Sequence, residues 1–165
     1  MAARTRSMAV QAWAVGGIVF LFAEAAWRLG MRGVATVRGG LSSHEWIILV
    51  LLTGVFVYGE GYRALQRRWV PYVLARVARL RTERFLTWRI GAPLYAMSLI
   101  GPTWRTALRA WAGVAAIITA VLIVSRFPEP WRGIVDIAVA AALIWGAVAL
   151  IYGALRMLRA GNGEG

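Results

Sequence analysis

The chain contains no cysteine, no lysine and only one histidine, His44, among its 165 residues. Without cysteine it can form no disulfide, thiolate metal site or iron–sulfur cluster. A single histidine also excludes a haem held by two histidines of one chain. The phosphate-cradling glycine loop, the nucleophile elbow and the His-Glu-x-x-His zinc motif are all absent. The sequence therefore predicts no catalytic residue, no cofactor and no metal ligand, and nothing in it favours an enzyme.

Acidic residues are scarce as well. Seven Asp and Glu stand against nineteen basic residues, all of them Arg, and the formal net charge is +12. Such a balance can indicate a nucleic-acid binder. However, 60% of the residues are hydrophobic, against about 45–50% in a soluble domain, and the charge is interrupted by long apolar runs. These features favour an integral membrane protein whose arginines contact anionic lipid headgroups, with no nucleic-acid partner.

The apolar runs predict an all-α, polytopic membrane protein that forms a single domain. A bilayer crossing needs about 20 residues, and the four runs have about that length, the second being the shortest. The first run also has the layout of a signal peptide, but we expect a retained helix. The four transmembrane helices are expected at about 8–29, 46–62, 106–125 and 133–155.

The segments around these runs carry their own signals. Residues 30–41 are rich in glycine and predict a loop, and 161–165 predict a disordered tail. Ser42 and Glu45 have the spacing of a capping box at the start of the second helix. The short turn at 126–132 predicts that the third and fourth helices are antiparallel neighbours.

A basic segment, 63–105, separates the second and third spans. The stretch 63–109 holds ten Arg and a single acidic residue. Pro71 is expected to open a short helix with Val73, Val77 and Leu80 on one face, ending near Thr82. This pattern is typical of a basic helix that lies in the membrane interface. The residues expected to bind anionic headgroups are Arg63, Arg67, Arg68, Arg76, Arg79 and Arg84.

The uncharged stretch 90–104 leaves one ambiguity in the topology. Pro93 and the Gly101-Pro102 pair interrupt it, which favours an interfacial or re-entrant segment, although a fifth span stays open. With four spans, both termini and the basic segment share one side. The other side holds only Arg28, Arg32, Arg38, Arg126 and Arg132. The positive-inside rule therefore predicts a bacterial inner-membrane protein with both termini in the cytoplasm.

Three acidic residues are candidate intramembrane polar sites: Glu24, Glu60 and Asp136. A carboxylate in an apolar span is a hypothesis for a proton or cation site. For Glu24 we favour the simpler alternative, an ion pair with Arg28 one helical turn away. Asp136 has the alternative role of stabilising a helix N-terminus through the helix dipole.

Glu60 is flanked by Gly59 and Gly61, which permit close backbone approach and can loosen a helix. We expect Glu60 either to mark a hinge of the helix or to form an ion pair with an arginine of the basic segment. His44 is expected to be exposed in the first turn of the second helix. Glu24, His44, Glu45 and Asp136 would all lie towards the outer side, so their convergence there is a testable hypothesis.

These observations favour a non-enzymatic accessory or scaffold subunit, in a homo-oligomer or a larger membrane complex, with anionic lipid at its cytoplasmic face. One alternative is a small oligomeric transporter or channel that uses Glu24 or Glu60. A second alternative is a lipid-binding or lipid-modifying protein that uses the arginine-rich face.

Overall fold

The computed structural model describes residues 2–80, 91–100 and 103–162, which form helices and their connections. Four of the described helices are long and apolar enough, by length and composition, to cross a membrane. This confirms the predicted all-helical class with four such helices. The elements are, in chain order, α1 (Ala2–Arg38), α2 (Ser43–Phe56), η1 (Val57–Trp69), α3 (Val70–Arg79), α5 (Ala92–Ala96), α6 (Trp104–Val124) and α7 (Trp131–Asn162).

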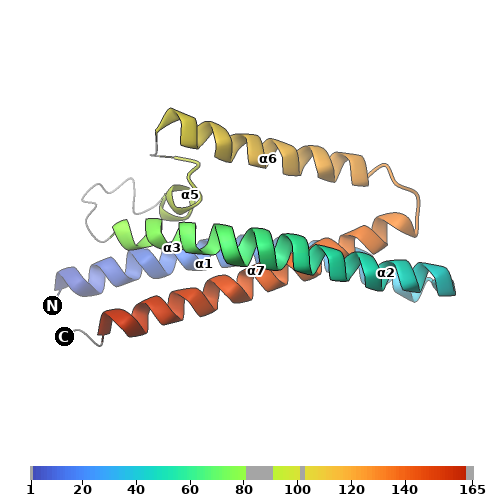
Figure 1. Ribbon diagram of the computed structural model, residues 1–165, viewed down its shortest axis with the longest axis horizontal. Coiled ribbons are helices and arrows are strands. Elements are labelled where there is room, and N and C mark those ends of the chain that lie inside the picture. The colour runs from blue at the N-terminus through green and yellow to red at the C-terminus, as the bar shows by residue number, and fades with distance from the viewer. Residues whose placement is uncertain (1, 81–90, 101–102, 163–165) are drawn as a thin grey trace.

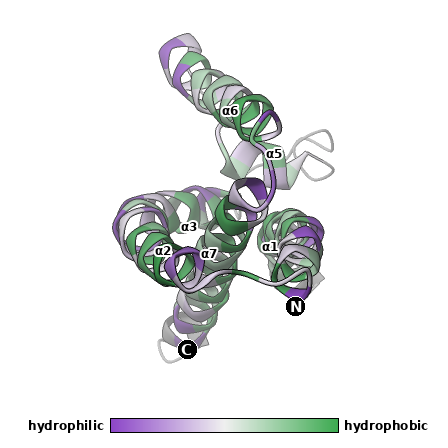
Figure 2. Ribbon diagram, turned by 90° about the vertical axis from the view of Figure 1, so that its right-hand side faces the viewer, coloured by the Kyte–Doolittle hydropathy of each residue, from purple (hydrophilic) through white to green (hydrophobic). Residues whose placement is uncertain are grey.

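α7 is the central helix of the bundle. Figure 2 shows α1 on one of its sides and α2 on the other, and α7 packs against both. Glycines make these contacts close. A Cβ on Gly33 of α1 would lie 2.2 Å from Ile137 Cγ1, and a Cβ on Gly146 of α7 would lie 2.5 Å from Leu65 Cδ1. Small residues at an interface allow two helix backbones to approach each other in this way.

α1 is longer than the first span that the sequence predicts. The loop expected over 30–41 is wrong for most of its length, because α1 continues to Arg38. Gly33 is buried against α7, so packing compensates for the low helix propensity of glycine. The helix ends where the N–H of Gly39 bonds back into the last turn at 3.0 Å. Gly40 follows with a φ of +92°, which glycine adopts without strain.

The second of the four long apolar helices runs without interruption from Ser43 to Arg79 through α2, η1 and α3. Its predicted capping box is present, with the N–H of Ser42 donating to Glu45 Oε2 at 2.7 Å. Pro71 lies in the first turn of α3, as expected. However, α3 continues the direction of α2 (Figure 1) and does not form the separate interfacial helix that the sequence suggests.

The apolar face expected on α3 exists, but protein covers it. Val73 and Val77 are fully buried in a cluster that includes Ile18 of α1 and Leu150 of α7. The sequence pattern predicts this face against lipid. Helical periodicity identifies an apolar environment without distinguishing a bilayer from a neighbouring helix, which is why prediction and structure differ. The break expected near Thr82 lies outside the described residues.

The segment 91–100 packs onto the bundle and forms no fifth spanning helix. α5 is five residues long, and Ala92, Pro93 and Ala96 are buried, with α1 and α3 as neighbours. A Cβ on Gly17 of α1 would lie 2.6 Å from Pro93 Cγ, so this glycine makes room for the proline ring. The breakers that interrupt this stretch therefore fold it into a short buried turn of helix.

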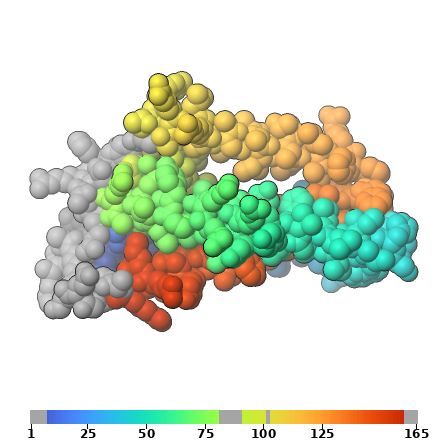
Figure 3. Space-filling model, viewed as in Figure 1, coloured from blue at the N-terminus to red at the C-terminus, as the bar shows by residue number. Residues whose placement is uncertain are grey.

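α6 stands apart from the other helices (Figures 1 and 2). It runs opposite to α7, but the two helices do not pack together, so the prediction that they are neighbours is wrong. No residue of α6 is buried. Figure 3 shows the helix as a separate ridge along one side of the molecule. Its first half is attached near α5, where Trp111 Nε1 donates to the carbonyl of Leu99 at 3.3 Å.

Both termini lie at the end of the bundle that carries α3 and α5 (Figure 1). The opposite end carries the α1–α2 and α6–α7 connections. The tail predicted over 161–165 is wrong for Gly161 and Asn162, because α7 runs to Asn162. Residues 163–165 lie outside the described part of the chain.

Candidate functional site

Four of the six arginines expected to bind headgroups are exposed on the half of the second helix nearer the termini. Arg63, Arg67 and Arg68 belong to η1 and Arg79 to α3. The guanidinium of Arg67 lies 5.5 Å from the centre of the Tyr62 ring. Their contact with lipid stays a prediction. Arg84 lies outside the described residues.

Arg76 has a different environment, because it is only 9% exposed. Its Nε donates to the carbonyl of Tyr95 at 2.9 Å, and its guanidinium lies 4.2 Å from the centre of the Tyr95 ring. Beside it, the hydroxyls of Tyr72 and Ser98 are 2.7 Å apart. Arg76 Nη2 is buried and has no hydrogen-bond partner among the described residues. These contacts fasten the α5 segment to α3.

Glu24 forms the expected ion pair with Arg28, and both side chains are exposed on α1. This prediction is confirmed. Glu60 is exposed, and no basic nitrogen of the described residues lies within ion-pair distance of it. Of its two glycines, Gly61 allows close approach, since a Cβ there would lie 3.2 Å from Trp145 Cβ. Glu60 also lies within η1, whose hydrogen bonds follow the wider π-helical pattern.

Asp136 is 5% exposed, and within the described part of the chain its buried Oδ2 has no hydrogen-bond partner. It lies in the second turn of α7, beneath the end of the bundle opposite the termini. His44 is exposed in the first turn of α2, as predicted, with Nδ1 at 3.0 Å from Ser42 Oγ. The four polar residues expected to converge therefore do not form one site: Glu24 pairs along α1, and His44 contacts its own capping residue.

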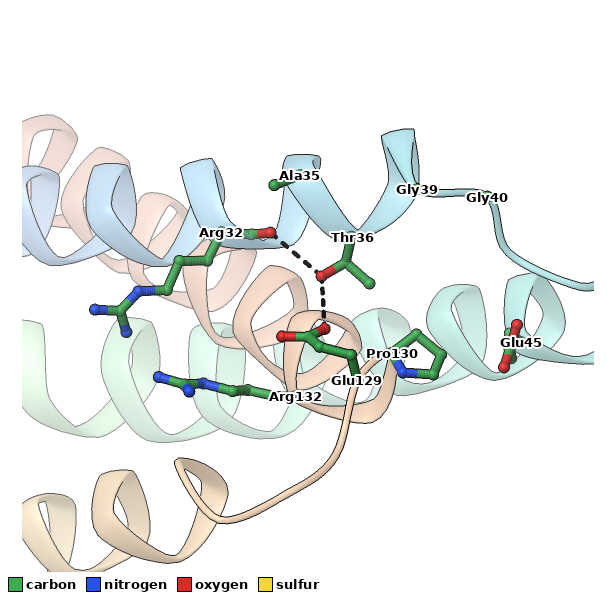
Figure 4. A pocket seen from close by; sticks show the side chains of 9 residues that line it. All are labelled: Arg32, Ala35, Thr36, Gly39, Gly40, Glu45, Glu129, Pro130 and Arg132. Atoms are coloured by element: carbon green, nitrogen blue, oxygen red, sulfur yellow. Dashed lines mark hydrogen bonds between the residues drawn. The ribbon is translucent and has the colours of Figure 1, made fainter.

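A pocket of about 670 Å³ opens at that end of the bundle, between the end of α1 and the starts of α2 and α7 (Figure 4). It brings together two arginines and two glutamates from segments far apart in the sequence. Thr36 Oγ1 donates to Glu129 Oε2 at 2.9 Å and lies 3.3 Å from the carbonyl of Arg32. The charged residues of its lining are Arg32, Arg132, Glu45 and Glu129.

The charges of this pocket are separated along its length. Figure 4 shows the side chains of Arg32 and Arg132 extending in one direction, Glu129 between them and the rest of the pocket, and Glu45 at the far side. Among the described residues, no carboxylate lies within ion-pair distance of either arginine. Such an arrangement can bind a ligand that carries an anionic and a cationic group.

Of the pocket residues, only Glu45 is a candidate that the sequence identifies. The sequence places Arg32 in a predicted loop and uses only its charge, as evidence for the orientation in the membrane. The structure places Arg32 on the last turns of α1. Arg132 and Glu129 are about 100 positions further along the chain, and no local pattern links them to α1. The one sequence feature that could have pointed to the pocket is that arginines stand close to both the α1–α2 and the α6–α7 connections.

Among the described residues, no group of three or more His, Asp or Glu side chains could hold a metal ion. Comparison of the chain with protein-family models, with curated proteins and with solved structures finds no match.

Proposed function

We propose that the protein is a non-enzymatic accessory or scaffold subunit of a membrane complex, and that α6 is the helix it offers to its partner. A bacterial inner membrane with both termini in the cytoplasm is the proposed location. The observation that carries the proposal is the isolation of α6 from the rest of the fold.

Beyond its first two turns α6 is apolar on every side, and none of its residues is buried. Ile117, Ile118 and Ile123 point in three different directions around the helix, and they are 66%, 55% and 55% exposed. A helix that served only its own bundle would bury one stripe of its surface against a neighbour, as α7 does. An unpacked spanning helix supports a role in contacts with another chain.

One face of α6 is suited to a helix–helix contact. Ala112, Ala116 and Ala120 recur at every fourth position and form a stripe of small side chains, while Trp111 and Ile118 lie on the other face. In membranes, helices associate through such small residues, because their backbones can then approach closely and gain van der Waals contact. We assign the alanine stripe to the partner helix.

Anionic lipid is the second proposed partner. Arg63, Arg67, Arg68 and Arg79 are exposed on the half of the second helix nearer the termini. Each arginine near an anionic leaflet contributes on the order of 1 kcal/mol. Arg76 is excluded from this group, because its guanidinium is engaged with Tyr95.

The absence of cysteine makes the partner contact directly testable, since a single introduced cysteine can carry a photo-cross-linker. In native membranes, Ala116→Cys should give an adduct of defined mass with another protein chain. Ile118→Cys, on the opposite face of the same helix, is the matched control and should give little. Adducts of equal yield at both positions, or lipid adducts only, would refute a partner on the alanine stripe.

The lipid contact has its own test. The double variant Arg63→Gln/Arg67→Gln should reduce the anionic lipid that copurifies in mild detergent. Arg126→Gln, at the opposite end of the bundle, is the control and should leave that lipid unchanged. If the two variants retain the same amount of anionic lipid, the arginines of η1 do not bind it.

A transporter that uses Glu60 is the second candidate function, and η1 is the observation that favours it. Single π-type turns inside helices are frequent at functional sites, and here 13 residues adopt this pattern around Glu60. Glu60→Gln should then abolish an ion flux in reconstituted vesicles while the protein still elutes as a folded species. An unchanged flux, or no flux in either protein, would leave only the scaffold role.

A further inference from the structure

We propose that the pocket between α1, α2 and α7 binds a zwitterionic group composed of a phosphodiester and a primary ammonium, as in the headgroup of phosphatidylethanolamine. This ligand is distinct from the anionic lipid and the partner helix of the proposed function, and the site lies at the opposite end of the bundle.

The cationic part of the pocket carries two guanidiniums, which also act electrostatically on the buried carboxylate of Asp136 without forming an ion pair with it. Arg32 and Arg132 extend in the same direction (Figure 4), and no carboxylate of the described residues forms an ion pair with either. A guanidinium has five N–H donors in a planar fork that matches the oxygens of a phosphate. Two such forks from different helices can hold one phosphodiester from two sides.

The anionic part of the pocket has accepting oxygens left over. Glu129 receives the hydroxyl of Thr36 on Oε2, and Glu45 receives the N–H and hydroxyl of Ser42 on Oε2. These bonds fix the two carboxylates in position and leave Oε1 of each without a hydrogen bond among the described residues. A primary ammonium has three N–H donors for such oxygens.

The balance of charge selects a zwitterion over a simple anion. Two guanidiniums and two carboxylates give the lining a formal net charge of zero. A ligand carrying only a phosphate would leave the carboxylates unpaired, and one carrying only an ammonium would leave the guanidiniums unpaired. The pocket volume of about 670 Å³ is within the range of small-molecule sites, roughly 300–1,000 Å³.

The position of the pocket favours a lipid as the source of this group. It lies where three apolar helices end, and Trp46 and Trp131 stand in the first turns of α2 and α7 beside it. Tryptophan is enriched at the headgroup level of bilayers, because its ring is apolar and its N–H is polar. The pocket is therefore at the depth of a headgroup.

Native mass spectrometry of the full chain in detergent, with each lipid added separately, tests the proposal. Wild-type protein should bind phosphatidylethanolamine more tightly than phosphatidylcholine, whose quaternary ammonium has no N–H to donate. Arg32→Gln/Arg132→Gln should weaken phosphatidylethanolamine binding by about tenfold or more, since the loss of one charge-assisted hydrogen bond lowers an affinity by about that factor. Arg38→Gln and Arg126→Gln, at the same end but outside the pocket lining, should bind as the wild type does.

Glu129→Gln keeps the shape of the side chain and tests the ammonium subsite without removing the arginines. It should reduce the preference for phosphatidylethanolamine over phosphatidylcholine while phosphatidylglycerol binding stays the same. Competition by soluble glycerophosphoethanolamine separates the two sources: displacement at equal concentration indicates a soluble ligand of the same chemistry, and failure to displace indicates the lipid. Equal affinity of all three lipids for the wild type, or wild-type affinity in both pocket variants, would overturn the proposal.

Discussion

The crossing of α1 and α7 at Gly33 gives the sharpest test of the fold. A Cβ at Gly33 would lie 2.2 Å from Ile137 Cγ1 and 3.1 Å from the carbonyl oxygen of Gly133. The isoleucine side chain can change rotamer, but the carbonyl belongs to the backbone of α7. Gly33→Ala must therefore separate the two helices, and overpacking of this kind costs about 1–3 kcal/mol.

Gly30→Ala is the matched control, because Gly30 lies one turn earlier in α1 and a Cβ added there would meet no other atom within 4 Å. Replacing glycine by alanine inside a helix also contributes about 0.5–1 kcal/mol of stabilisation through the backbone. That contribution is common to both variants and cancels between them. The difference in free energy of unfolding between Gly30→Ala and Gly33→Ala should then be about 1–3 kcal/mol.

The assay is reversible unfolding in mixed micelles, followed by the loss of helical circular dichroism as the denaturing detergent is increased. Gly133→Ala extends the series, since its Cβ would lie 2.4 Å from Thr36 Cβ, an atom that no rotamer change can move. This variant should be destabilised relative to Gly30→Ala as well. Equal stability of Gly30→Ala and Gly33→Ala would show that α1 and α7 are not in contact at this crossing.

Three further variants test local contacts by the same assay. Arg76→Met should lower the free energy of unfolding by about 1.5–3 kcal/mol, because the carbonyl of Tyr95 loses a charged donor, and it should speed proteolysis within 91–100; an unchanged digestion pattern would contradict this role. Ser42→Ala should cost about 0.5–2 kcal/mol through loss of the helix cap, and no change would mean that the cap contributes nothing. Glu24→Gln removes an exposed ion pair worth only about 0.2–0.5 kcal/mol, so a large loss of stability would show a further role for this carboxylate.

The number of helices long and apolar enough to cross a membrane could be predicted from the sequence, because long apolar runs are sufficient to identify them. Their ends could not. Local propensity predicts a loop at Gly30 and Gly33, yet Gly33 is retained in α1 because α7 packs against it. Propensity is a local property, and the contact that overrides it comes from a residue about 100 positions away.

The candidate sites show the same limit. The ion pair of Glu24 and the cap at Ser42 involve residues within one helical turn, so spacing alone identifies them. The burial of Arg76 depends on a carbonyl that lies on another element. The pocket is lined by the end of α1 and the start of α7. The sequence shows that both segments carry an arginine, but it does not show that Arg32 and Arg132 line the same pocket.

The arrangement of the bundle restricts where a protein partner can bind. α7 is covered by α1 on one side and by the long second helix on the other, and glycine contacts close both interfaces (Figure 2). A partner helix could reach α7 there only by displacing one of these neighbours and losing its packing. α6 buries no residue against another helix, so a partner could bind along its alanine stripe without displacing one. Because no residue of α6 is buried, α6 is the helix that we propose for contact with a partner.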